Sequence, residues 1–347
     1  MSRVLTQNVI CEQLNYRKIC MANKTSNKLN KERAKFSVNE PLVYEKIEDV
    51  ESIPKGDMPG DKIQIDANHI EKAQLIFPTL LEHLIPMLDE HPYQRIVISV
   101  CGGSGVGKSE TASLLSYYLN QMNVGCYILS GDNYPRRIPK YNDAERLRVY
   151  RNAGIKGLIA SGEYSEDKKE ILRQLQESAN DTSLDYAKDF TWLATYQQAG
   201  RHELKEYLGS SREINFDELN SIVSQFKNGS DYIHIKRMGR TDSELWYDLI
   251  DFSDKNVMIV EWTHGNNNNL LGVDIPIFLN STPKETLEHR RRRSRDGEVD
   301  STFTQTVLAI EQELLHSQAS KAKIILTKKG EILEYSEYLA ITNQIDI

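Results

Sequence analysis

Short runs of β-branched and other apolar residues recur from residue 95 onward, and longer stretches of helical character separate them. Each run has the length and composition of a buried strand. The five runs are residues 95–101, 126–130, 257–260, 275–279 and 323–326. Because continuous apolar strands that alternate with helices are typical of a parallel sheet covered on both faces, the pattern predicts a three-layer α/β fold with a mostly parallel sheet.

A long amphipathic stretch precedes the first run. Apolar residues recur near helical spacing over residues 67–90, which predicts an N-terminal helical extension there. Pro78 and Pro86 fall inside this stretch. Proline cannot donate the hydrogen bond of a helix interior, so we expect the two prolines to kink or divide the helix.

A second helical stretch separates the second apolar run from the third and covers about residues 141–227. It is too long for a simple crossover between neighbouring strands. We interpret it as a helical insertion, which either covers the active site or forms a small structural subdomain.

The first run leads directly into a complete G-x-x-x-x-G-K-[ST] motif at Gly102–Ser109, with a helical stretch after it. Glycines let this backbone turn tightly and point N–H groups at phosphate, and the helix N-terminus adds positive potential. We expect Lys108 to reach the β- and γ-phosphates of ATP and Ser109 to ligate Mg²⁺. The alternative, a turn that binds nothing, is disfavoured by the complete motif between a strand and a helix. The predicted nucleotide contacts are Gly102, Gly103, Ser104, Gly105, Val106, Gly107, Lys108, Ser109 and Glu110.

Acidic residues follow two other runs at what should be the same edge of the sheet. Asp132 comes just after residues 126–130, and Glu261 ends the run at 257–260. Ligands bind beyond the carboxyl ends of parallel strands, so both carboxylates should lie near the phosphate loop. Asp132 either accepts the proton of an attacking hydroxyl or holds the metal, and a plain turn is the alternative. Glu261 is expected to meet Mg²⁺ directly or through water.

An arginine cluster follows the fourth run. It comprises Arg290, Arg291, Arg292, Arg293 and Arg295. On a helix, Arg291 and Arg295 share one face, and we expect these two to close over ATP and stabilise charge on the transferring phosphoryl group. The alternative is a solvated basic face.

The predicted acceptor contacts carry hydrogen-bonding or cationic groups beside the expected strands. His264 and the asparagines after it form a polar loop that suits a hydroxylated acceptor, although a plain loop is the alternative. His234 and Arg237 belong to a cluster beside a further predicted strand, and they either bind an anionic group or lie on the surface. The full set is Asp132, Tyr134, Arg137, His234, Arg237 and His264.

The net charge and the composition limit the classes of binding partner and the location that we expect. The formal net charge is −7 and the isoelectric point is near 5.7, which argues against general nucleic-acid binding. No apolar run reaches the length of about 18 residues that a membrane helix needs, so no membrane partner is expected. Cys101 and Cys126 lie in apolar runs as small hydrophobes, which favours a reducing, cytoplasmic location. The sequence allows a homodimer.

Several of these segments, in this order, resemble the phosphoribulokinase/uridine kinase group of P-loop kinases. Residues 130–134 are similar to the group's S-x-D-x-[FY] segment, whose Asp is the catalytic base. Residues 214–219 resemble its F-D-x-x-L stretch, and Val260-Glu261 its acidic strand end. Residues 274–280 and 290–296 resemble its apolar strand followed by an Arg-rich lid. The resemblance implies an ATP- and Mg²⁺-dependent kinase that phosphorylates a hydroxyl of a small molecule.

Two alternatives remain beside this interpretation. Residues 129–133 also resemble the D-G-D-N segment of adenylylsulfate kinases, although Ser130 stands where that family has Asp. An alternative of another class is a switch or binding protein in which the ATP state controls the helical insertion or the basic N-terminal arm.

The patterns together divide the chain into five parts. The expected parts are a partly irregular N-terminal arm at 1–60, a helical lead-in at 61–94, a P-loop kinase core at 95–140 and 213–335, the helical insertion at 141–212, and a C-terminal tail at 336–347.

Overall fold

A six-stranded sheet lies at the centre of the computed structural model, which describes residues 44, 47, 52–60, 63–293 and 301–345. The strand order is β2-β5-β1-β6-β7-β8. Five strands run parallel, and β8 pairs antiparallel with β7. The strands are β1 (Ile96–Gly102), β2 (Cys126–Ser130), β5 (Val257–Glu261), β6 (Ile275–Leu279), β7 (Ile324–Leu326) and β8 (Ile332–Leu333). The predicted α/β fold with a mostly parallel sheet is therefore confirmed.

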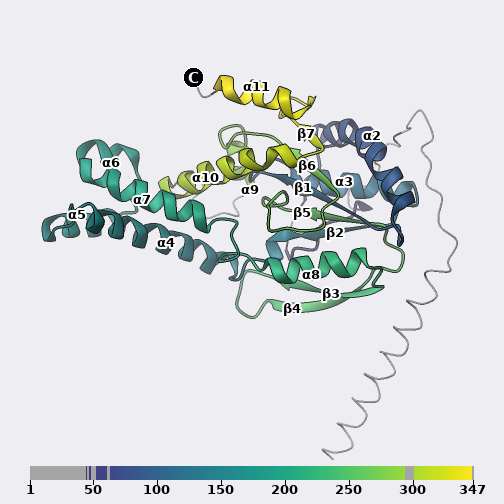
Figure 1. Ribbon diagram of the computed structural model, residues 1–347, viewed down its shortest axis with the longest axis horizontal. Coiled ribbons are helices and arrows are strands. Elements are labelled where there is room, and N and C mark those ends of the chain that lie inside the picture. Colours follow the sequence, from purple (N-terminus) through teal and green to yellow (C-terminus); the bar gives the residue numbers. More distant parts are fainter. Residues whose placement is uncertain (1–43, 45–46, 48–51, 61–62, 294–300, 346–347) are drawn as a thin grey trace, which may run out of the picture.

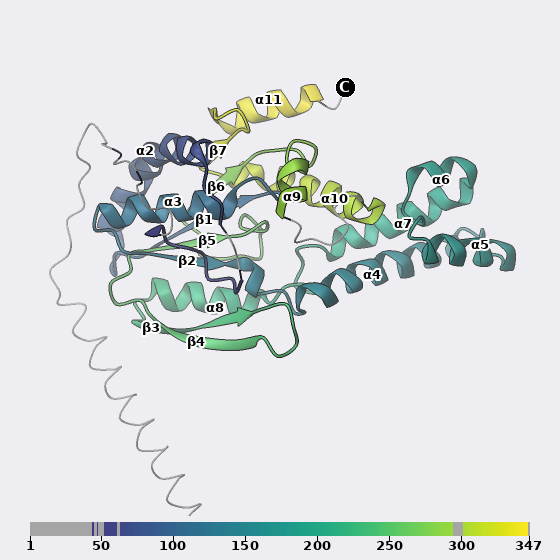
Figure 2. The ribbon, with the colours of Figure 1, turned by 180° about the vertical axis from the view of Figure 1, so that it is seen from behind.

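Alternate residues of the central strands face two different cores. Ile98 of β1 packs with α2 (Ala67–Glu90) and α3 (Lys108–Gln121). Its neighbour Val97 packs on the other face with α8 (Phe216–Lys227). Figures 1 and 2 show α2 and α3 on one side of the sheet and α8 on the other. Both faces are covered, which is why the central strands are continuous apolar runs in the sequence.

An antiparallel hairpin lies outside α8 and forms a second, two-stranded sheet. It consists of β3 (Tyr232–Met238) and β4 (Leu245–Asp251). The apolar pattern does not predict β4, because most of this strand is exposed.

Helix α2 runs unbroken through Pro78 and Pro86, so of the two expected effects, a kink or a division, the division is wrong. Each interior proline costs about 3 kcal/mol of helix stability. The helix, however, buries six large apolar side chains, each worth about 1.5–3 kcal/mol. Packing against the sheet therefore outweighs the lost hydrogen bonds.

Four helices form an arm that projects away from the sheet (Figure 1). They are α4 (Pro139–Ala160), α5 (Glu166–Glu177), α6 (Leu184–Asp189) and α7 (Thr191–Tyr207). A Cβ on Gly154 of α4 would lie 2.4 Å from the Tyr196 ring of α7, so only glycine allows this close packing. Ile310 of α10 (Thr302–Gln318) joins the apolar core of the arm. The predicted helical insertion thus exists, and α10 anchors it to the rest of the chain.

The remaining helices lie near the C-terminal part of the sheet. They are α9 (Leu287–Arg293) and α11 (Tyr335–Ile345). Across the described ranges, no helix combines the length and the hydropathy that crossing a bilayer requires.

Candidate active site

The phosphate loop connects β1 to α3 with the geometry that the motif requires. Gly107, the N-cap of α3, has φ 98°, in the left-handed region that favours glycine. Gly105 has φ 78°, and a Cβ there would lie 3.1 Å from Arg290 Cγ. The Lys108 ammonium donates to the Gly103 carbonyl at 3.1 Å, so it lies along the loop. The N-terminus of α3 therefore faces the space that a phosphate would occupy.

Both predicted carboxylates lie at the same edge as this loop. Parallel pairing places Glu261 opposite Val100 of β1 and Ser130 of β2, at the carboxyl ends of all three strands. Asp132 lies in the short 3-10 turn η2 (Gly131–Asn133) that follows β2, and it is exposed. The structure thus brings the predicted loop and the two acids together.

The donor atoms at this edge fit a magnesium ion. Ser109 opens α3, and Asp132 and Glu261 offer carboxylate oxygens. The described residues contain no preassembled group of three or more His, Cys, Asp or Glu side chains around one point. Mg²⁺ in kinase sites takes only one or two protein carboxylates and completes its shell with water and phosphate oxygens, so this sparse oxygen set suits it.

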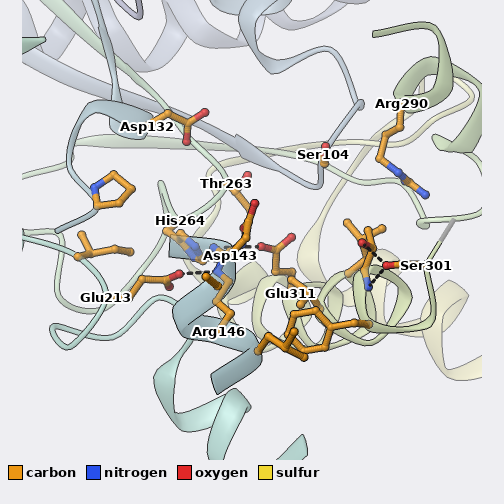
Figure 3. A pocket seen from close by; sticks show the side chains of 18 of the residues that line it. Ser104, Asp132, Asp143, Arg146, Glu213, Thr263, His264, Arg290, Ser301 and Glu311 are labelled. Carbon is orange, nitrogen blue, oxygen red and sulfur yellow. Dashed lines mark hydrogen bonds and ion pairs between the residues drawn. The ribbon is translucent and has the colours of Figure 1, made fainter. Parts of the chain in front are cut away.

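A pocket of about 500 Å³ opens beside the phosphate loop, within the usual size range of small-molecule sites (Figure 3). Its walls come from the phosphate loop, η2, α4, the loop after β5 and α10. The charged lining residues are Asp132, Asp143, Arg146, Glu213, Arg290 and Glu311. Four carboxylates thus face two guanidinium groups around this space.

Arg146, which is partly buried, and Glu213, which is buried, form an ion pair in the wall of the pocket. The Arg146 Nε donates to Glu213 Oε1 at 2.6 Å, and Asn142 donates to the same oxygen at 3.0 Å. The Gly209 amide donates to Glu213 Oε2 at 2.7 Å. Burial alone would raise the pKa of Glu213, but Arg146 and these donors outweigh it and lower the pKa. The pair therefore stays ionised and ties α4 to the end of the arm.

His264 lies in the same wall without a charge of its own at neutral pH. It is buried, and burial lowers the pKa of its imidazole to about 4. Its ring packs edge-on against Trp262, with 5.0 Å between the ring centroids. His264 therefore offers a neutral hydrogen-bonding group to the pocket.

Within the described part of the predicted arginine cluster, Arg290 reaches the pocket, although the sequence favoured Arg291 and Arg295. It is 5% exposed and packs over Gly105 of the phosphate loop. Its NH1 donates to the Pro283 carbonyl at 2.9 Å and to Thr286 Oγ1 at 2.5 Å. Arg291 is exposed and is not among the lining residues, and Arg295 lies outside the described residues.

Four of the predicted acceptor contacts lie away from the pocket. Tyr134 is fully buried in the core under α8. Arg137 donates to the Tyr207 hydroxyl at 3.2 Å, and His234 is exposed on β3. Arg237 forms an ion pair with Asp57 at 2.7 Å. Of the predicted set, the structure places only Asp132 and His264 in the pocket lining.

Several lining residues carried no recognisable signal in the sequence. Asp143 and Arg146 lie within the helical insertion, Glu213 follows it, and Glu311 belongs to α10. No motif connects residues so far apart, and only the packing of the arm against the core brings them together.

The chain is similar in sequence to known proteins. The Zeta toxin family matches residues 87–208, which include the phosphate loop and the arm helices. The bifunctional alpha-galactosidase/sucrose kinase AgaSK of Mediterraneibacter gnavus is 37% identical over 255 residues. That match covers 74% of this chain but 22% of AgaSK, so the chain spans about a fifth of the length of this relative.

Two solved structures show weaker likeness. One is a kinase assigned to a fructose transport system in Silicibacter sp. TM1040, with a TM-score of 0.43 and 12% identity over 71% of this chain and 94% of that one. The other is a possible uridine kinase from Bacillus stearothermophilus, with a TM-score of 0.34 and 12% identity over 74% and 97% of the two chains. The family match and the relative named as a kinase both support the prediction of a P-loop kinase.

Proposed function

We propose that this P-loop kinase transfers the γ-phosphate of ATP to a hydroxyl group of an uncharged saccharide. The relative AgaSK, which is named as a sucrose kinase, makes sucrose the first acceptor to test. ATP would lie on Gly102–Ser109, and the acceptor would fill the adjacent pocket between η2, α4 and α10.

The charge of the pocket is the observation that carries this proposal. Asp132, Asp143, Glu213 and Glu311 contribute four carboxylates, against two arginines. His264 adds no positive charge at neutral pH, because burial lowers its pKa to about 4. An anionic acceptor would be repelled by this surplus of negative charge. Adenylylsulfate and sugar phosphates are therefore disfavoured, whereas carboxylates accept hydrogen bonds well from sugar hydroxyls.

The arm supplies much of the acceptor wall in this proposal. Asp143 and Arg146 come from α4, and Glu213 follows the arm. Arg146 is held in place by Glu213 at 2.6 Å and lies 3.9 Å from Glu311 of α10. A preorganised pair of this kind can orient a sugar at low entropic cost. We therefore assign acceptor recognition to the helical insertion rather than a purely structural role.

The chemical step would use groups at the edge of the sheet. Asp132 would accept the proton of the acceptor hydroxyl as its oxygen attacks the γ-phosphorus, while the bond from the γ-phosphorus to the bridging oxygen breaks and ADP leaves. Lys108 and Arg290 would offset the charge on the transferring phosphoryl group. Ser109 and Glu261 would hold Mg²⁺, which would neutralise charge on the β- and γ-phosphates when bound.

The location and assembly state are further parts of the proposal. Cys101 and Cys126 are free and buried, and burial raises the pKa of each thiol to about 12. Buried, unreactive thiols suit a reducing compartment, so we propose a cytoplasmic kinase. The homodimer that the sequence allows stays a prediction.

The test is a screen for ADP release and phosphorylated product with purified protein, ATP and Mg²⁺. The uncharged acceptors would be sucrose, fructose, glucose and glycerol, and the anionic ones ribulose 5-phosphate and adenylylsulfate. We expect turnover with a saccharide and none in Lys108→Ala, whose loss removes the phosphate contact of the loop. Turnover with anionic acceptors alone would overturn the assignment, and slow ATP hydrolysis that no acceptor stimulates would favour the switch.

A further inference from the structure

The carboxylate of Asp57 is buried beneath the turn that carries Asp132. Residues 52–60 lie along the chain before α2, and the Asp57 side chain is 6% exposed. Strand β2 is at the edge of the six-stranded sheet, and its last residue is Ser130. The carboxylate of Asp57 lies at that strand end and accepts four hydrogen bonds there.

The four donors divide between the two carboxylate oxygens. Oδ1 accepts from the Ser130 amide at 2.7 Å and from Asn133 Nδ2 at 3.0 Å. Oδ2 accepts from the Tyr127 hydroxyl at 2.8 Å and from Arg237 NH1 at 2.7 Å. Ser130 and Asn133 are the residues on either side of the Gly131-Asp132 step. One oxygen thus holds both ends of the turn.

The turn is fixed to the hairpin as well. Asn133 Oδ1 accepts from the Met238 amide of β3 at 3.0 Å, so the Asn133 side chain bridges Asp57 and β3. Arg237 of the same strand reaches Asp57 from the other side. The two ends of η2 are therefore clamped between the segment before α2 and the β3–β4 hairpin, and Asp132 projects from the clamped turn.

Neutralising Arg237 does not by itself explain this arrangement. Arg237 Nε also donates to Asp248 at 3.0 Å, and Asp248 is 45% exposed. Asp248 is thus a second acid that can neutralise the Arg237 guanidinium. The bonds from Ser130 and Asn133 go to the other carboxylate oxygen, and they fix the position of the turn.

We propose that Asp57 is a positioning residue for phosphotransfer, which holds η2 so that the Asp132 carboxylate meets the acceptor hydroxyl. The inference rests on the proposed role of Asp132 as the base. Asp57 itself is not among the lining residues of the pocket. A displacement of about 1 Å at a reacting group can cost a factor of about 100 in rate, so a clamp of this kind matters to catalysis.

The first test compares Asp57→Asn with Asp248→Asn, two isosteric changes at carboxylates that share Arg237. An amide in place of Asp57 must turn its NH₂ toward one pair of donors. Arg237 is charged and keeps the oxygen, so the bonds to Ser130 and Asn133 are lost. We expect kcat to fall about 10- to 100-fold with KM for ATP unchanged. Asp248→Asn should stay within about twofold of wild type, and equal losses in both variants would overturn the proposal.

A double mutant separates positioning from a general structural role. If Asp57 acts through Asp132, Asp57→Asn should cost little in the Asp132→Asn background, where the base is already absent. The same loss of kcat in both backgrounds would show that Asp57 acts elsewhere and would overturn the proposal.

Hydrogen exchange gives a readout that needs no acceptor. Asp57→Asn should speed exchange about tenfold in a peptide covering residues 128–134 and leave the phosphate loop at 102–109 unchanged. Unchanged exchange at 128–134 overturns the clamp, whatever the activity. Failure of the proposed function looks different, because the wild-type protein would then phosphorylate no acceptor in the screen.

Discussion

Gly131 lies directly against the indole ring of Trp262. A Cβ on Gly131 would lie 2.0 Å from Trp262 Cγ, far inside van der Waals contact. Trp262 is 2% exposed and also packs against the rings of Phe216 and His264, so it cannot move aside. The residue before Asp132 must therefore be glycine, and Trp262 forms the floor under the turn that carries the proposed base.

Gly131→Ala should consequently push η2 away from Trp262. We expect a loss of about 1–3 kcal/mol in the free energy of unfolding, the usual cost of overpacking, together with a fall in turnover. Chemical denaturation and ADP release measure the two effects. Gly56→Ala is the matched control, because its Cβ would meet Ile128 at an ordinary 3.7 Å, and it should change stability by less than about 0.5 kcal/mol. A Gly131→Ala protein that is as stable and active as the control would contradict the steric argument.

The sequence predicted the parts of the site that local pattern determines. Gly102–Ser109 is a contiguous motif, and Asp132 and Glu261 follow apolar strands whose carboxyl ends must share an edge in a parallel sheet. Strands β2 and β6 coincide with the predicted runs at 126–130 and 275–279, because the local apolar pattern also determines these strands.

The acceptor wall could not be predicted, because it depends on tertiary packing. Arg146 and Glu213 are 67 positions apart and meet only when α4 packs against α7 within the arm. The clamp on η2 is of the same kind, since Asp57 and Arg237 are 180 positions apart. For the arginine cluster, the sequence predicted a lid but could not predict the rotation of α9 about its axis. A shift of one residue moves the pocket contact from Arg291 to Arg290.

Arg290→Ala should lower kcat much more than Arg291→Ala does. Arg290 packs over the phosphate loop, whereas Arg291 is exposed. Removing a group that stabilises transition-state charge typically costs about 100- to 1000-fold in kcat. Arg290→Lys retains the charge without the fork of donors and should lie between wild type and Arg290→Ala. Steady-state kinetics together with thermal melts separate this effect from unfolding. A larger loss of kcat in Arg291→Ala than in Arg290→Ala would favour Arg291, the residue predicted from the sequence.

The stability of the fold should depend on pH through His264. Burial lowers the pKa of His264 from 6.5 to about 4, so between these values the unfolded chain binds a proton that the folded chain does not. Stability therefore falls as the pH drops through this window, and the loss from this residue between pH 7.5 and pH 5 is about 2 kcal/mol. Urea unfolding at the two pH values measures it.

His264→Gln should remove that part of the pH dependence, and His234→Gln should leave it intact because His234 is exposed on β3. The comparison between the two variants cancels the contributions of the other titrating groups. If His264→Gln loses as much stability on acidification as wild type does, the buried neutral imidazole is not the cause.

Asp132→Asn tests the chemical step itself. The substitution preserves the shape of the turn, but an amide cannot take the proton of the acceptor hydroxyl. ATP binding should survive, because the loop amides, Lys108 and Ser109 are untouched, and calorimetry would show a dissociation constant close to that of wild type. Phosphotransfer should fall by about two to four orders of magnitude, the usual scale for general-base catalysis. Asp189→Asn on α6 is the matched control, since this acid is exposed on the arm and is not among the lining residues of the pocket.

A magnesium series distinguishes the two roles open to Asp132. A base that is absent cannot be replaced by metal, so turnover in Asp132→Asn should stay low at every Mg²⁺ concentration. If Asp132 were mainly a metal ligand, raising the Mg²⁺ concentration would restore part of the activity. Ser109 and Glu261 would still bind the ion in Asp132→Asn, but with lower affinity. Full activity in Asp132→Asn would remove this residue from the mechanism. The proposed positioning role of Asp57 would then also fail, because it depends on Asp132. The prediction of a nucleotide site on Gly102–Ser109 would be unaffected.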